Sequence, residues 1–96
     1  MEKKIVVSKR FQKNTLALYN YLIKEYSAKT AYHFLGSLQL RVEYISQHPE
    51  VGKPSHKKAN VRSMLLPPYN RIYYRINNDT IELLCLFDMR RKDKPY

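Results

Sequence analysis

The sequence has few glycines and cysteines: two glycines and one cysteine occur among its 96 residues, and tryptophan is absent. It therefore contains neither of the glycine-rich patterns, GxGxxG or GxxxxGKS/T, whose backbones cradle nucleotide phosphates. Cys85 is the only cysteine, which excludes an intrachain disulfide. Since it lies within the apolar run Ile81–Phe87, we interpret it as a small buried side chain and not as a nucleophile.

Long apolar segments are also missing. No run of about 18 apolar residues occurs, so a membrane-spanning helix is not expected, and no basic amphipathic helix offers a wide apolar face to lipid. Residues 1–10 pass directly from charged residues into a short β-branched run, unlike a secretory signal peptide. These absences predict a cytoplasmic protein without a membrane partner, and the length predicts a single domain over residues 1–96.

Acidic residues are scarce relative to basic ones: 8 Asp and Glu stand against 18 Lys and Arg, giving a formal net charge of +10 at pH 7. The excess positive charges repel one another in the folded state, and binding to a polyanionic partner offsets that repulsion. RNA, DNA, the ribosome and an acidic protein segment are the candidate partners. The alternative interpretation is a basic surface that is merely solvated.

The apolar pattern predicts one strand and two helices in the first half of the chain. The β-branched run Ile5–Val7 is typical of a short strand. Ser8 can cap a helix that runs to about Tyr26, and Ser27 can cap a second helix that runs to about Gln47. Because almost no linker separates the two helices, we expect them to form an antiparallel hairpin.

Three strands are predicted in the second half, after a polar loop that opens at His48–Pro54. They are Val61–Leu66, Tyr69–Asn77 and Thr80–Phe87, and the last is apolar at nearly every position, which favours a central place in the sheet. The predicted fold is α+β in the order β-α-α-β-β-β. An antiparallel meander sheet carries the N-terminal helical hairpin on one face.

The segment Tyr69–Asn77 alternates between two kinds of side chain. Ile72, Tyr74 and Ile76 share one side, and the opposite side carries Tyr69, Arg71, Tyr73 and Arg75. We therefore expect arginines and tyrosines on the face of the sheet that the helices leave bare.

The order and spacing of four segments resemble the RelE/ParE superfamily of bacterial type II toxins. These segments are Ile45–Pro54, Val61–Ser63, Tyr69–Ile76 and Leu84–Arg91. The resemblance extends over nearly the whole chain. It implies a toxin that is held by a cognate antitoxin with an acidic, amphipathic segment that folds on binding. It leaves two activities open: RelE-like members cleave mRNA on the ribosome, whereas ParE-like members inhibit DNA gyrase.

Some residues of this sequence match those of the nuclease branch, and others do not. Arg71 and Arg90 match the arginines of that branch, and Tyr96 follows Arg90 at the interval of its tyrosine. Arg62 falls where the branch has a lysine, and Met64 falls at a second lysine whose charge a thioether cannot replace.

RNA cleavage by the adjacent 2′-hydroxyl requires a base, an acid and cations that stabilise the developing charge on phosphorus. Clustered arginines and a tyrosine can supply these groups without a metal or cofactor, since neighbouring positive charge lowers the pKa of a tyrosine. The candidate catalytic residues are Arg62, Arg71, Arg90 and Tyr96, provided that they meet in one pocket. Exposed strand arginines and a free chain end are the structural alternatives.

A second set of basic and aromatic side chains is predicted to contact nucleic acid: Lys53, Lys57, Lys58, Tyr69, Tyr73, Arg75, Arg91 and Lys92. The three histidines have no metal-ligand spacing, so no metal site is expected. Asp88 is expected to orient Arg90 or Arg71 through a charge-assisted hydrogen bond.

Three functions therefore stay open from the sequence. The first is a ribosome-dependent, metal-independent mRNA endoribonuclease, supported by the spacing of the arginines and Tyr96. The second is a non-enzymatic inhibitor of DNA gyrase, supported by the long helical hairpin and by Met64. The third is a basic binding module without toxicity.

Overall fold

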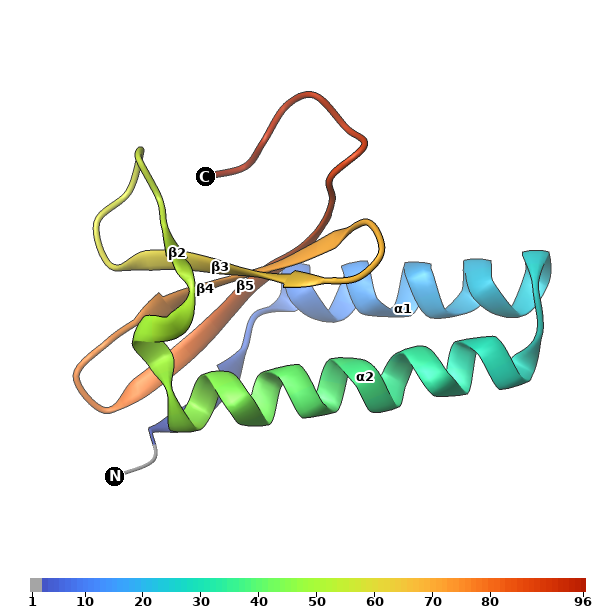
Figure 1. Ribbon diagram of the computed structural model, residues 1–96, viewed down its shortest axis with the longest axis horizontal. Coiled ribbons are helices and arrows are strands. Elements are labelled where there is room, and N and C mark those ends of the chain that lie inside the picture. The colour runs from blue at the N-terminus through green and yellow to red at the C-terminus, as the bar shows by residue number, and fades with distance from the viewer. Residues whose placement is uncertain (1–2) are drawn as a thin grey trace.

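The computed structural model describes residues 3–96 and consists of two long antiparallel helices beside a five-stranded sheet (Figure 1). In chain order the elements are β1 (Lys4–Val7), α1 (Lys9–Glu25), α2 (Ala28–Gln47), the 3-10 turn η1 (Pro49–Val51), β2 (Lys53–Pro54), β3 (Val61–Leu66), β4 (Asn70–Ile76) and β5 (Thr80–Asp88). The predicted order of one strand, two helices and three strands is confirmed. Within residues 3–96, neither helix is long and apolar enough to cross a membrane.

Both helices begin at the serines that the sequence predicts as caps. The Ser8 hydroxyl accepts a hydrogen bond from the Phe11 amide at 3.0 Å, and the Ser27 hydroxyl accepts one from the Thr30 amide at 3.0 Å. These bonds satisfy amides that the first turn of a helix leaves without an intrahelical partner. Ser8 also donates to the carbonyl of Leu84 at 2.8 Å, which ties the start of α1 to β5.

The sheet has the strand order β1-β5-β4-β3-β2. β3, β4 and β5 form the predicted antiparallel meander, and the apolar β5 lies inside the sheet as expected. β1 pairs with β5 in parallel, so the sheet is mixed rather than purely antiparallel. Without β1, the most apolar strand would expose a free edge, and unpaired edges invite association with other chains.

The helical hairpin covers one face of the sheet, as predicted (Figure 1). The main core lies between them and consists of Phe11, Leu38, Ile45, Leu66, Ile72, Tyr74, Ile81, Leu83 and Leu86. A second, smaller cluster of Val61, Tyr73, Leu84, Cys85 and Phe87 occupies the opposite face, and Tyr96 packs against it. The segment after β5 turns back over this second face (Figure 1), so the face expected to be bare is partly covered by the chain itself.

One irregularity in β5 decides which side chains face the helices at its end. The pairing with β4 passes from Tyr73↔Cys85 to Tyr74↔Leu83, so Leu84 is an extra residue on β5. Such a β-bulge shifts the alternation of the residues that follow it. The last residue of β5 consequently faces α1 and not the second cluster.

The segment between α2 and β3, predicted as a loop, contains η1 and the short edge strand β2. The buried Tyr74 hydroxyl holds this segment against the sheet. It donates to the carbonyl of Pro49 at 2.7 Å and accepts from the amide of Gly52 at 3.0 Å. A side chain of β4 therefore positions the turn from which β2 starts.

Candidate functional site

A cavity of about 180 Å³ surrounds the Arg71 side chain on the face of the sheet away from the helices. Its lining includes basic and aromatic side chains but no aspartate or glutamate. The polar and aromatic members are Lys53, Ser55, His56, Ser63, Arg71, Tyr73, Lys94 and Tyr96. We call this the Arg71 cavity; four strands and the segment after β5 contribute to it.

Arg71 is oriented within the cavity by Ser63. The guanidinium Nε donates to the Ser63 hydroxyl at 3.0 Å, and Ser63 is itself buried. Tyr73 and Tyr96 lie beside this pair with their ring centroids 5.6 Å apart. Burial raises the pKa of the Tyr73 phenol above its ordinary value, and the nearby Arg71 opposes that rise. The Tyr73 hydroxyl is therefore protonated near neutral pH.

Arg62 does not reach the Arg71 cavity. It lies on β3 opposite Tyr74, on the side of the sheet that the helices cover. Its Nη1 donates to the carbonyls of Glu50 at 3.1 Å and Gly52 at 2.8 Å. Arg62 is thereby engaged in holding the η1 turn, which is a structural role.

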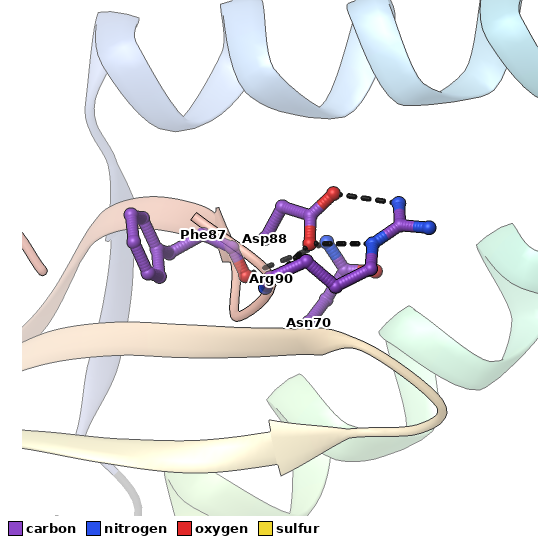
Figure 2. Close-up of polar contacts among 4 residues, drawn as sticks. All are labelled: Asn70, Phe87, Asp88 and Arg90. Carbon is purple, nitrogen blue, oxygen red and sulfur yellow. Dashed lines mark hydrogen bonds and ion pairs between the residues drawn. The ribbon is translucent and has the colours of Figure 1, made fainter. Parts of the chain in front are cut away.

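Arg90 also lies on the helix side of the sheet, where its guanidinium is hydrogen-bonded to Asp88 (Figure 2). The Asp88 carboxylate accepts from Arg90 Nε at 3.0 Å, from Nη2 at 2.7 Å and from the Arg90 amide at 2.9 Å. The guanidinium also lies over the Tyr69 ring, 4.4 Å from its centroid. The hydrogen bonds from Arg90 hold the pKa of Asp88 below its ordinary value. The expectation that Asp88 orients one of these arginines is met for Arg90.

Arg90 and Asp88 line two adjoining cavities of about 440 and 450 Å³ between α1 and the end of the meander. These cavities form a groove: Arg10 and Arg91 line the first cavity, Tyr26 and Tyr69 line the second, and Tyr21 lines both. We call it the α1 groove. It lies on the opposite side of the sheet from the Arg71 cavity.

The structure thus divides the four residues that were expected to meet in one pocket. Arg71 and Tyr96 line the same cavity, whereas Arg62 is bonded to η1 and Arg90 to Asp88. The expectation of a single convergent arginine pocket is therefore wrong. The physical reason is the alternation of β3, which turns Arg62 toward the helices, and the bulge in β5, which turns Asp88 toward α1.

The residues predicted to contact nucleic acid also separate. Lys53 and Tyr73 line the Arg71 cavity, and Lys57 and Lys58 are exposed in the loop beside it. Tyr69 was expected on the face of Arg71, but it precedes β4 in a turn and lines the α1 groove.

Of three further members of that predicted set, Arg91 lines the α1 groove, whereas Arg75 and Lys92 line neither site. Arg75 is paired with Glu82 at 3.3 Å. Arg91 lies over the Phe87 ring, 6.0 Å from its centroid, and Lys92 is exposed.

Four polar side chains of the Arg71 cavity were not among the predicted site residues: Ser55, His56, Ser63 and Lys94. Ser63 could have been found from the pairing of β3 with β4, because it lies opposite Tyr73. His56 and Lys94 lie in segments without regular structure, and nothing in their spacing predicts where those segments fold. Among residues 3–96, no three histidine, cysteine or acidic side chains come close enough to hold a metal ion.

Comparison with known proteins gives one family match. The family model for the ParE toxin of the type II toxin–antitoxin system parDE matches residues 5–93. No curated protein matches the sequence itself.

Several solved structures are similar to this chain. The chromosomal ParDE toxin–antitoxin system of P. aeruginosa matches with TM-score 0.79 and 16% identity, covering 91% of this chain and 96% of that chain. The toxin–antitoxin complex RelBE2 of Mycobacterium tuberculosis matches with TM-score 0.65 and 16% identity over 92% and 99% of the two chains. The E. coli DinJ–YafQ toxin–antitoxin complex matches with TM-score 0.68 and 10% identity over 94% and 96%. At such identities the likeness establishes a common fold.

Proposed function

The chain belongs to the ParE toxin family of type II toxin–antitoxin systems, and from that premise we propose that it acts by binding and inhibiting DNA gyrase, without cutting RNA. The observation that carries this proposal is the separation of the arginines. The arginines that the resemblance assigns to nuclease chemistry would have to surround one phosphate, but Arg62 is hydrogen-bonded to the η1 segment and Arg90 to Asp88. A toxin that inhibits by binding needs no such convergence.

The position of Met64 supports the same proposal. Its side chain packs against the main core beneath the helices, so it contributes neither charge nor contact to the Arg71 cavity. The nuclease branch has a lysine at the matching position. Of the catalytic groups that the resemblance implies, Arg71 and Tyr96 alone share a cavity here.

The proposal includes a cognate antitoxin as the partner that neutralises the toxin. An acidic, amphipathic segment fits the net charge of +10. The α1 groove is lined by both arginines and tyrosines, which is a surface for such a segment.

Expression of the toxin in growing cells tests the proposal. We expect growth to stop while a reporter mRNA, mapped by primer extension, stays uncut and plasmid DNA loses its negative supercoiling. Tyr96→Phe is the matched variant, because it removes the hydroxyl that nuclease chemistry needs and keeps the ring against Tyr73. It should stop growth as the wild type does. New mRNA ends that appear with the wild type and vanish with Tyr96→Phe would overturn the proposal.

A second candidate is the ribosome-dependent mRNA endoribonuclease. One observation favours it: Arg71, Tyr96 and His56 share a cavity that no aspartate or glutamate lines. A cation, a phenol and an imidazole can together stabilise charge and transfer protons. The primer-extension experiment decides between the two candidates.

A further inference from the structure

Arg71 differs from the other strand arginines in what its guanidinium contacts. Arg62 donates to two backbone carbonyls, and Arg75 forms an ion pair with Glu82. Arg71 donates from Nε to the Ser63 hydroxyl, and within residues 3–96 no carboxylate or carbonyl receives a hydrogen bond from its two terminal nitrogens. A guanidinium has five N–H donors, so four remain available to a ligand.

The surroundings of Arg71 are suited to an anion. Lys53, His56 and Lys94 line the cavity with it, and no acidic side chain does. Ser63 is 7% exposed and fixes the direction of the guanidinium before any ligand arrives. A cation that is held in place loses less conformational entropy when it binds, which favours binding.

The size of the cavity selects the kind of anion. A volume of about 180 Å³ lies below the range of roughly 300–1,000 Å³ that holds drug-sized ligands. Such a space admits a small anion such as one phosphate group. The exposed Lys57 follows His56 directly on the loop after β2, and Lys58 lines a separate cavity with Glu50. Basic side chains that extend past a single phosphate site suit a polymer with regularly spaced negative charges, such as a nucleic acid.

We propose that the Arg71 cavity binds one backbone phosphate of a nucleic acid and that the neighbouring lysines bind the adjacent phosphates. The nucleic acid bound there is the DNA on which gyrase acts. Its identity as that DNA rests on the proposed function, whereas the phosphate site does not. The toxin would then contact gyrase and its DNA together. Recognition of phosphates alone carries no sequence preference.

Fluorescence anisotropy with a short labelled duplex and the purified toxin, without gyrase, tests the site. Raising the salt from about 50 to 200 mM should weaken binding steeply, with a log–log slope of about −0.9 for each phosphate contacted. Arg71→Gln should weaken binding at least about fivefold and reduce the size of the slope by about 1.

Arg75→Gln is the matched control. It removes the same charge from the same strand, but from a guanidinium that Glu82 already neutralises. It should change affinity less than about twofold and leave the slope unchanged. Equal effects of the two variants, or binding that does not depend on salt, would overturn the site.

A second variant guards against a folding defect in Arg71→Gln. Lys53→Gln combined with Lys94→Gln alters two exposed side chains and should reduce the slope by about 2. Single-stranded DNA and RNA of the same sequence distinguish the source of the phosphate. Binding of duplex DNA supports the proposal, and binding of RNA alone overturns the assignment to DNA.

The proposed function and this inference fail separately. Duplex binding that depends on Arg71, with gyrase unaffected by the toxin, would retain the phosphate site and refute gyrase as the target. Gyrase inhibition by a toxin that binds no duplex would refute the site and retain the target.

Discussion

The Tyr74 hydroxyl links β4 to the turn before β2, and two backbone groups depend on it. The Tyr74 ring is fully buried, and its oxygen bonds both the Gly52 amide and the Pro49 carbonyl. Gly52 allows this contact because a Cβ at that position would overlap the hydroxyl and approach the Ser63 carbonyl to 2.9 Å. Close approach, and not a special backbone angle, explains the glycine.

Tyr74→Phe should therefore lower the free energy of unfolding by about 1–3 kcal/mol, because a buried amide and carbonyl lose their partner. Urea denaturation monitored by circular dichroism measures the change. Tyr32→Phe is the control, since that side chain is 76% exposed, and it should change stability by less than about 0.5 kcal/mol. Equal stability of the two variants would show that the hydroxyl does not hold the turn.

Asp88 makes stability depend on pH in a defined direction. Hydrogen bonds from Arg90 hold the pKa of Asp88 below the ordinary value of 3.8. The contribution of its carboxylate is therefore present above that ordinary value and is lost as the pH falls through the lower folded-state pKa. Asp88→Asn should destabilise the protein at neutral pH, and the difference from wild type should shrink in acid.

Urea denaturation of both proteins across this pH range checks the prediction. Asp93→Asn is the control, because its carboxylate is 83% exposed and lies 3.9 Å from Arg91. That variant should have little effect at any pH. A difference between Asp88→Asn and wild type that stays constant into acid would contradict the role given to Asp88.

Half of the polar side chains, tyrosines included, that line the Arg71 cavity could be predicted from the sequence alone. Alternation along β4 places Arg71 and Tyr73 together, and the structure agrees. It could not place Arg62, because β3 reads Val-Arg-Ser-Met-Leu-Leu and has no clean alternation from which to assign its faces. Nor could it place Arg90, whose side depends on the extra residue in β5.

At the scale of the elements, the serine caps were predictable because capping is local. A hydroxyl reaches an amide three residues ahead regardless of the rest of the fold. The helical hairpin and the three-strand meander follow from periodicity for the same reason. The parallel pairing of β1 with β5 was not predictable, because it joins segments about 75 residues apart through backbone bonds that leave no pattern in the sequence. The two-residue strand β2 is too short to give a pattern.

The two caps differ in one respect that can be measured. Ser27→Ala removes the cap bond and an exposed bond to the Thr30 hydroxyl within the same turn, and it should lower stability by about 1 kcal/mol. Ser8→Ala removes the cap of α1 and also the bond to the Leu84 carbonyl on β5, so it should cost about 1 kcal/mol more. Thermal and urea denaturation compare the two variants. If Ser27→Ala proves the more destabilising, the link between α1 and β5 is not important for stability.

At the scale of the whole molecule, the charges are distributed over two sides of one sheet. The helix side carries Arg90 with its carboxylate partner, and the other side carries Arg71 without one. A molecule with a net charge of +10 can thus present a surface for a protein segment on one side and a phosphate site on the other. This division favours a toxin that holds its target by contact over one that cuts it.

Titration of purified gyrase with purified toxin, followed by supercoiling of relaxed plasmid, tests this claim most directly. A toxin that works by contact should reduce supercoiling in proportion to the amount added until activity ends at a fixed ratio of toxin to gyrase. Tyr96→Phe should give the same end point. Full supercoiling activity in a large excess of folded toxin would contradict the account.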